Sequence, residues 1–137
     1  TENVSLSPNL LSDDIALALD GDTLRLAWVD QDAQGLAFDT FFATRDPDGT
    51  LSEPARFTDD TQNDWAWFPS ITPNGACVWS LGQSPTNGVL WFADGAAPFA
   101  LFDGLERGGN PVLAGNADHL AYVAATSPGT IVYSRRE

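Results

Sequence analysis

The chain repeats one short pattern three times at a nearly constant interval. Prolines stand at positions 8, 54 and 98, separated by steps of 46 and 44 residues, and each is followed five residues later by an aspartate. Between them, short runs of alternating apolar and polar residues are divided by Gly, Pro, Asn and Asp, and the i, i+3, i+4, i+7 spacing of a helix is absent. We therefore predict an all-β chain built from repeats of one unit.

A period of roughly 40 to 50 residues made of short strands is typical of β-propeller blades, which bury their apolar faces only against neighbouring blades. We expect three four-stranded antiparallel units, near residues 15–58, 67–103 and 110–134, within a single domain spanning 1–137. The third unit lacks a fourth strand, whereas residues 4–12 match a fourth strand that no preceding unit owns. The pattern predicts that this N-terminal strand completes a last blade, an arrangement that hides a sheet edge.

The strands within each unit are delimited by turn residues. First strands are expected at 15–19, 69–72 and 111–114, second strands at 24–29, 77–79 and 120–123, third strands at 36–44, 89–93 and 130–134, and fourth strands at 55–58 and 99–102. Asp-Gly and Asn-Gly between the first two strands of units one and two are strong hairpin signals. Trp28, Trp79 and Tyr122 then occupy one equivalent position, where we expect the tryptophans to be core residues.

Composition excludes several classes of function. The 137 residues carry a formal net charge of −13, and all six cations are arginines, so the surface repels nucleic acid and anionic lipid. Membrane insertion is not expected, because the chain has no apolar run of about 20 residues. Cys77 is the single cysteine, which rules out an intramolecular disulfide, and its apolar surroundings indicate a core residue. A start at Thr1 without a leader fits a processed chain, so we expect a secreted or periplasmic protein.

These features resemble a known family of propellers. Strands ending in Ala-Trp or Val-Trp, with Ser-Glu-Pro opening an outermost strand, are similar to the bacterial neuraminidase repeat of the sialidase-like superfamily. Residues 44–51 read Thr-Arg-Asp-Pro-Asp-Gly-Thr-Leu, a degenerate copy of the family's Asp-box with one extra residue. The resemblance implies rings of six blades. Three blades are half of such a ring, and we expect a head-to-tail homodimer in which residues 4–12 of each copy complete the third blade of the other.

Polar and aromatic residues, including those of the run 63–67, gather in the connecting loops that are expected to form the ligand-binding face of the propeller. The strongest candidate is the run 63–67, in which tryptophan planes stand beside carboxylate and amide groups, as a sugar site requires. The alternative is that one or both tryptophans wedge between blades. Residues expected to bind ligand are Asn63, Asp64, Trp65, Trp67, Asp30, Asp32, Gln83 and Arg107.

Three functions fit this pattern. We expect a non-catalytic, lectin-like propeller that binds carbohydrate without a cofactor; the alternatives are a sialidase-type glycoside hydrolase and a structural or protein-interaction propeller. The resemblance implies an Arg-Ile-Pro motif and an arginine triad for an active sialidase, and Arg-Ile-Pro is absent. His119 and the tyrosines lie in strand patterns. Residues 30–35 begin like a calcium loop, but position twelve would be Phe41 instead of glutamate, so we interpret them as a turn.

Overall fold

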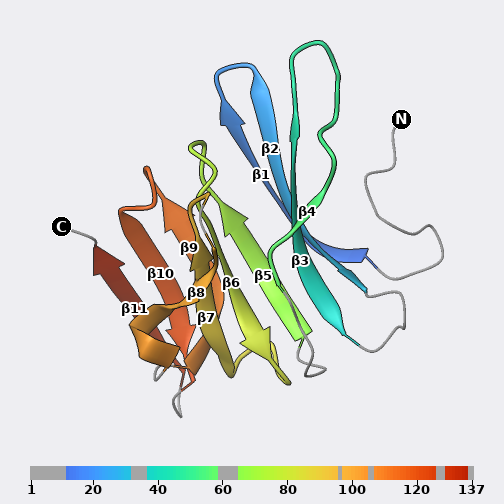
Figure 1. Ribbon diagram of the computed structural model, residues 1–137. Coiled ribbons are helices and arrows are strands. Elements are labelled where there is room, and N and C mark those ends of the chain that lie inside the picture. The colour runs from blue at the N-terminus through green and yellow to red at the C-terminus, as the bar shows by residue number, and fades with distance from the viewer. Residues whose placement is uncertain are drawn as a thin grey trace.

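The computed structural model describes residues 12–31, 37–58, 65–95, 97–104, 107–125 and 129–135. Across these ranges the protein is all-β, with eleven strands and one 3-10 turn (Figure 1). Nine strands follow one another in a single curled sheet, and two short strands pair with its members from the side. No helix in the described part of the chain is long and apolar enough to cross a membrane.

The first of three antiparallel meanders contains β1 (Ser12–Asp20), β2 (Thr23–Gln31), β3 (Phe38–Arg45) and the short β4 (Ala55–Arg56). The turn from β1 to β2 contains Gly21 at a φ of 59°, as the Asp-Gly signal predicts. Another turn carries β3 back to β4, where Asp48 accepts a hydrogen bond from the Thr50 amide at 2.8 Å. Both turns lie at the upper end of Figure 1.

The second meander contains β5 (Trp65–Ile71), β6 (Cys77–Gly82), β7 (Gly88–Ala93) and β8 (Phe99–Ala100), followed by the 3-10 turn η1 (Leu101–Gly104). The third contains β9 (Arg107–Ala114), β10 (His119–Ala124) and β11 (Thr130–Arg135). The order of strands within each meander agrees with the prediction. The first strands begin earlier than predicted. Pro69 and Pro111, the expected first residues of β5 and β9, lie inside these strands.

Backbone pairing between the meanders is sparse. A single parallel pair, Phe38 with Trp65, joins the first to the second. Two antiparallel pairs, Gly88 with Gly108 and Val89 with Arg107, join the second to the third. By contrast, β2 and β3 share eight pairs along their length. Side-chain packing between meanders must therefore supply most of their cohesion.

The pairing register confirms one predicted equivalence. Trp28, Trp79 and Tyr122 pair with Phe41, Trp91 and Val132 at the same step of the second and third strands of each meander. Trp28, Trp79 and Tyr122 are all at most 3% exposed. Cys77 is also fully buried, as expected for a small core residue.

An aromatic stack packs the first meander against the second. Phe57, which follows β4, lies between Phe42 of β3 and Trp79 of β6, with ring centroids 5.7 Å apart and planes 14° apart on both sides. Ala27, Val29 and Ile71 surround this stack in the largest buried cluster. The outermost strand of one meander is thereby fixed to the middle strand of the next.

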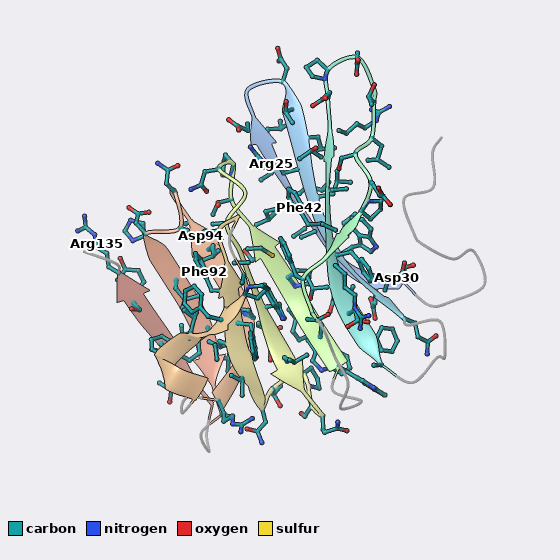
Figure 2. All side chains as sticks on the ribbon, viewed as in Figure 1. Arg25, Asp30, Phe42, Phe92, Asp94 and Arg135 are labelled. Atoms are coloured by element: carbon teal, nitrogen blue, oxygen red, sulfur yellow. The ribbon has the colours of Figure 1, made fainter. Side chains whose placement is uncertain are left out.

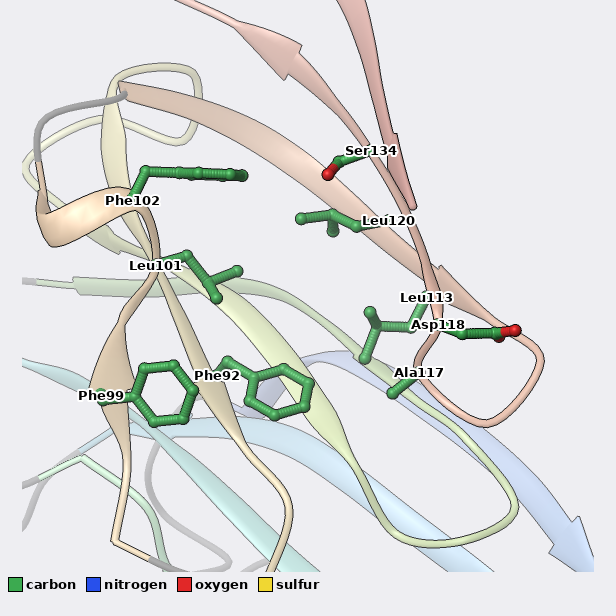
Figure 3. A pocket seen from close by; sticks show the side chains of 9 residues that line it. All are labelled: Phe92, Phe99, Leu101, Phe102, Leu113, Ala117, Asp118, Leu120 and Ser134. Atoms are coloured by element: carbon green, nitrogen blue, oxygen red, sulfur yellow. The ribbon is translucent and has the colours of Figure 1, made fainter. Parts of the chain in front are cut away.

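The second and third meanders pack more loosely. Between them lies an apolar cleft of about 380 Å³, seen from close by in Figure 3. Phe92, Phe99, Leu101 and Phe102 form one wall, and the other contains Leu113, Ala117, Asp118, Leu120 and Ser134. Register aligns Leu101 with Phe57 and Tyr122 with Trp79, so smaller side chains stand where the first junction has its stack.

Further boundaries differ from the sequence-based expectation. The fourth strand of the first unit was expected to reach Thr58, but it ends at Arg56. The fourth strand of the second unit was expected to reach Phe102, but it ends at Ala100, and Phe102 lies in the 3-10 turn with its ring 5.8 Å from Tyr122. Ser12, expected to end the N-terminal closing strand, is instead the first residue of β1. The rest of that expected strand, residues 4–11, lies outside the described residues.

Candidate functional site

The first strand of each meander carries the same irregularity. In β1 the pairing with β2 shifts register between Asp13 and Ile15. In β5 the corresponding shift lies between Trp67 and Ser70. In β9 it lies opposite Ala121 to Val123 of β10. At these shifts Asp14, Phe68 and Asn110 have positive φ angles of 42°, 50° and 49°. A β-bulge of this kind bends the strand and re-aims side chains.

Proline accounts for two of the three bulges, whereas the equivalent position in β1 is Ile15. Pro69 and Pro111 follow the bulged residues Phe68 and Asn110 directly. Because proline has no N–H to donate, it is tolerated within a sheet mainly at edges and bulges. The sequence pattern predicts strands that start at these prolines, so it does not predict the bulges ahead of them. The recurrence of a proline inside an apolar strand pattern was the signal that could have identified them.

The three bulges converge on one pocket, which we name the bulge pocket. Its volume is about 310 Å³, and its walls come from β1, β5 and β9. It is lined by Asp14, Ile15, Phe68, Pro69, Ser70, Asn110, Pro111 and Val112. Elements far apart in the sequence thus contribute equivalent residues to one concave, partly polar surface.

Hydrogen bonds connect the strands around the bulge pocket. The Asp14 carboxylate accepts the Phe68 amide N–H at 3.0 Å, linking the first meander to the second. The Ser70 hydroxyl oxygen accepts the Leu113 amide N–H at 3.0 Å, linking the second to the third. The irregular backbone around the bulges is therefore held in place by side chains of the adjacent meanders.

Aromatic rings lead from the surface to the bulge pocket along β5. The Trp65 ring lies 5.5 Å from Phe38 in an edge-on arrangement and 5.5 Å from Trp67. Trp67 in turn lies 6.3 Å from Phe68 of the bulge. Trp65 is 38% exposed, whereas Trp67 is half-buried and its indole N–H donates to the Gly82 carbonyl at 3.2 Å.

These two tryptophans were predicted to lie in a connecting loop, and that prediction was wrong. Both belong to β5, because the bulge allows the strand to extend ahead of Pro69. Trp67 fits the alternative of a packing residue. Trp65 combines an exposed ring with a fixed orientation, which is what a flat apolar platform for a ligand needs.

The Asp30 side chain, predicted to bind ligand, makes hydrogen bonds within the first meander. It is fully buried at the lower end of the first meander (Figure 2), where its carboxylate accepts hydrogen bonds from the Ser12 hydroxyl at 3.0 Å and the Gln31 amide at 3.1 Å. Asp30 pairs with Asp39 across β2 and β3. Since Asp30 lies within a strand, the expected turn over residues 30–35 begins later than predicted.

Asp39 is the second buried carboxylate of this region. It is 1% exposed, and it contacts the Arg56 guanidinium at 2.7 Å and the Thr58 hydroxyl at 2.5 Å. Thr58 also accepts the Thr40 amide N–H at 3.1 Å. A buried carboxylate is tolerated when it is paired and hydrogen-bonded in this way. Asp39 therefore anchors the segment after β4 to β3.

Of the remaining predicted ligand residues, the two that the structure describes lie near the beginning of β5 and β9. Gln83 directly follows β6, whose last residue Gly82 pairs with Trp65, and Gln83 is exposed. Arg107 is the exposed first residue of β9, and its carbonyl accepts the Ala125 amide at 2.8 Å. Asp32, Asn63 and Asp64 lie outside the described residues.

His119 makes polar contacts at the end of the third meander that is opposite to Arg107. Its Nδ1 lies 2.7 Å from the Tyr133 hydroxyl, and the two rings stack at 5.9 Å. Its Nε2 lies 3.5 Å from the Asp118 carboxylate. Among the described residues, no group of three or more His, Cys, Asp or Glu side chains is arranged to hold a metal ion.

A scan against protein-family models gives no match for this chain. A search of curated proteins also gives no match.

Proposed function

We propose that this chain forms three blades of a β-propeller and that the assembled ring binds carbohydrate at the bulge pocket and Trp65. The observation that carries the proposal is the convergence of one repeated bulge, from three units, on a single pocket, which the rings of Phe68 and Trp67 connect to the exposed Trp65. The meanders provide the blades, and their first strands are the inner ones. The bulge pocket would then lie near the ring axis.

The chemistry of the pocket suits a sugar. The Trp65 indole offers a flat face for the C–H side of a pyranose ring, while the Asp14 carboxylate and the Asn110 amide offer partners for hydroxyl groups. A volume of about 310 Å³ is at the lower end of the roughly 300–1,000 Å³ typical of small-molecule pockets, which favours a mono- or disaccharide. Weak single sites of this kind gain avidity when an oligomer repeats them.

The turn between β3 and β4 supports the resemblance to sialidase-like propellers. It occupies the position of an Asp-box, and its Asp48 carboxylate accepts the Thr50 amide N–H. This hydrogen bond lowers the pKa of Asp48 from its ordinary value. The turn is at the opposite end of the first meander from Asp30 (Figure 2), so it leaves the predicted ligand-binding end unobstructed.

A glycan array probed with the full chain tests the proposal. We expect binding to a restricted set of glycans, and we expect Trp65→Ala to weaken it at least about tenfold, equivalent to about 1.4 kcal/mol. Asn110→Asp should also weaken binding, because it removes the amide donor while preserving size. Phe99→Ala is the matched control, since Phe99 is 49% exposed on β8, outside the residues that line the bulge pocket.

An array without binding to correctly folded protein would refute carbohydrate recognition. Binding that survives Trp65→Ala unchanged would place the site elsewhere. Fluorogenic sialosides and other glycosides form the second arm of the test. Turnover of any of them would replace the lectin-like proposal with a sialidase-type glycoside hydrolase.

A further inference from the structure

Large apolar side chains are exposed on the two outer faces of the three-meander body. On the outer face of the first meander, which we name the leading face, Ile15, Leu17 and Leu19 of β1 are 61%, 57% and 63% exposed. On the opposite outer face, which we name the trailing face, Val112, Ile131 and Tyr133 are 57%, 79% and 62% exposed. Soluble proteins rarely leave such contiguous apolar surface uncovered unless it binds something.

Internal repetition shows what covers the same position on the other leading faces. Leu17, Ile71 and Leu113 are equivalent, because each pairs with Leu26, Cys77 or Leu120 at the same step of its meander. Ile71 and Leu113 are both 8% exposed, since the preceding meander packs against them. Leu17 has the same place in the first meander but no meander before it in the described structure.

The trailing face shows the complementary pattern. Thr40, Leu90 and Ile131 are equivalent by register, and the first two are completely buried. Phe92 and Tyr133 are likewise equivalent, and Phe92 is 6% exposed. Figure 2 shows Phe42 and Phe92 in corresponding places on the first and second meanders. The exposed residues of the trailing face are therefore those that the next meander covers elsewhere in the chain.

Charge favours joining a trailing face to a leading face. Arg25 of the first meander donates to the Pro73 carbonyl of the second at 2.6 Å and so bridges that junction. By register, His119 has the position of Arg25, and Arg135 pairs directly with His119. The turn between β1 and β2, at the same end of the leading face, carries Asp20 and Asp22. A cation, Arg135, thus lies at the end of the trailing face that corresponds to Asp22 on the leading face, whereas Asp20 already pairs with Arg25 at 2.7 Å.

We propose that the trailing face of one copy binds the leading face of a second copy and covers Leu17 as Ile71 and Leu113 are covered within the chain. Trp28, which corresponds to Trp79, is already buried. Two such contacts, related by a two-fold axis, join two copies head to tail. The six-bladed ring that results rests on the proposed function, whereas the contact itself rests on the exposure of equivalent residues. His119 holds Tyr133 in position for this contact through its 2.7 Å hydrogen bond.

Complementation between two blocked variants tests the proposal. Leu17→Glu disables the leading face, and Ile131→Glu disables the trailing face. Alone, each variant has one altered partner in both contacts of the dimer, so we expect its dissociation constant to rise at least about tenfold. Mixed in equal amounts, the two variants form a heterodimer in which one contact combines both changes and the other is fully wild-type. We expect the mixture to recover dimer.

Sedimentation velocity and light scattering are the measurements, without ligand and over a range of protein concentrations. Wild type should have twice the 14.6 kDa mass of one chain. Phe99→Glu is the matched control, because it places the same charge on an exposed aromatic outside both faces and should leave the dimer intact. If a blocked variant folds poorly, Leu17→Gln and Ile131→Gln replace the charge with a neutral polar group in the same test.

A monomeric wild type at about 100 μM would overturn the proposal, and so would a mixture that stays dissociated. Loss of dimer in Leu17→Glu with none in Ile131→Glu would show a leading-to-leading contact, which also overturns it. A larger closed oligomer would contradict the two-copy ring. Because mass is read without sugar, an empty glycan array leaves this result unaffected, and the two proposals can fail separately.

Discussion

Phe57 makes the junction between the first two meanders, and removing its ring should be costly. Deleting a fully buried phenylalanine costs about 3–5 kcal/mol, and Phe57 is half-buried, so burial alone gives about 2 kcal/mol. Its two stacked partners, Phe42 and Trp79, each add about 0.5–1.5 kcal/mol. We therefore expect Phe57→Ala to lower the free energy of unfolding by about 3 kcal/mol.

Urea unfolding measures this change in the free energy of unfolding. Tryptophan fluorescence follows the transition, because the buried Trp79 becomes exposed to water on unfolding. Phe57→Leu retains most of the volume but neither stack, and it should cost about 1–2 kcal/mol. Phe99→Ala is the control: Phe99 is 49% exposed and has one ring partner, Phe92, at 5.5 Å, so about 1 kcal/mol is expected. The reasoning fails if Phe57→Ala costs no more than Phe99→Ala at the same protein concentration.

Three further predictions follow from close contacts and burial. A β carbon at position 109 would lie 2.0 Å from the Pro85 carbonyl oxygen, so Gly109→Ala should cost about 3 kcal/mol in chemical unfolding. Arg56→Met should cost about 2 kcal/mol, since it leaves the buried Asp39 carboxylate without its cation; the usual 3–5 kcal/mol is reduced because Arg56 is 42% exposed. Burial raises the pKa of the Cys77 thiol from 9.0 to about 12, so a disulfide reagent at pH 8 should label it only upon unfolding.

Each of these predictions has an internal control. Gly129→Ala brings the β carbon to 3.3 Å from Val123 Cγ1 and 3.9 Å from the Ala124 carbonyl oxygen, so it should cost much less than Gly109→Ala. Arg56→Lys should restore part of the stability lost in Arg56→Met, and equal losses would contradict the ion-pair argument. For Cys77, the raised pKa favours the protonated folded state. The contribution of the Cys77 thiol to the free energy of unfolding is complete below pH 9 and is lost as the pH rises from 9 towards 12. Cys77→Ala should remove this pH dependence.

Much of the strand order could be predicted from local signals. Alternating runs and Asp-Gly or Asn-Gly turns identified the hairpins, and the shared position of Trp28, Trp79 and Tyr122 was confirmed by register and burial. These features depend on residues adjacent in the sequence. They are therefore visible before any tertiary contact is known.

The site was harder to predict because it depends on contacts between meanders. Trp65 and Trp67 were assigned to a loop, since Pro69 looked like a strand start, and the bulge that accommodates the proline was not anticipated. Asp14 and Asn110 were not selected, because nothing local distinguishes them from turn residues. Asp14 and Asn110 come together only when three bulges, separated by over 40 residues, meet at one pocket.

The sparse backbone pairing between meanders makes the molecule behave as a short one-dimensional array. Among the described residues, only Phe38 with Trp65 crosses the first junction by strand pairing, so each meander is coupled to its neighbours mainly through side chains. In such an array, total stability is close to a sum of unit terms and nearest-neighbour terms. Whole meanders should then be transferable as cassettes. A chain with an added second meander would gain one junction without changing the geometry inside any unit.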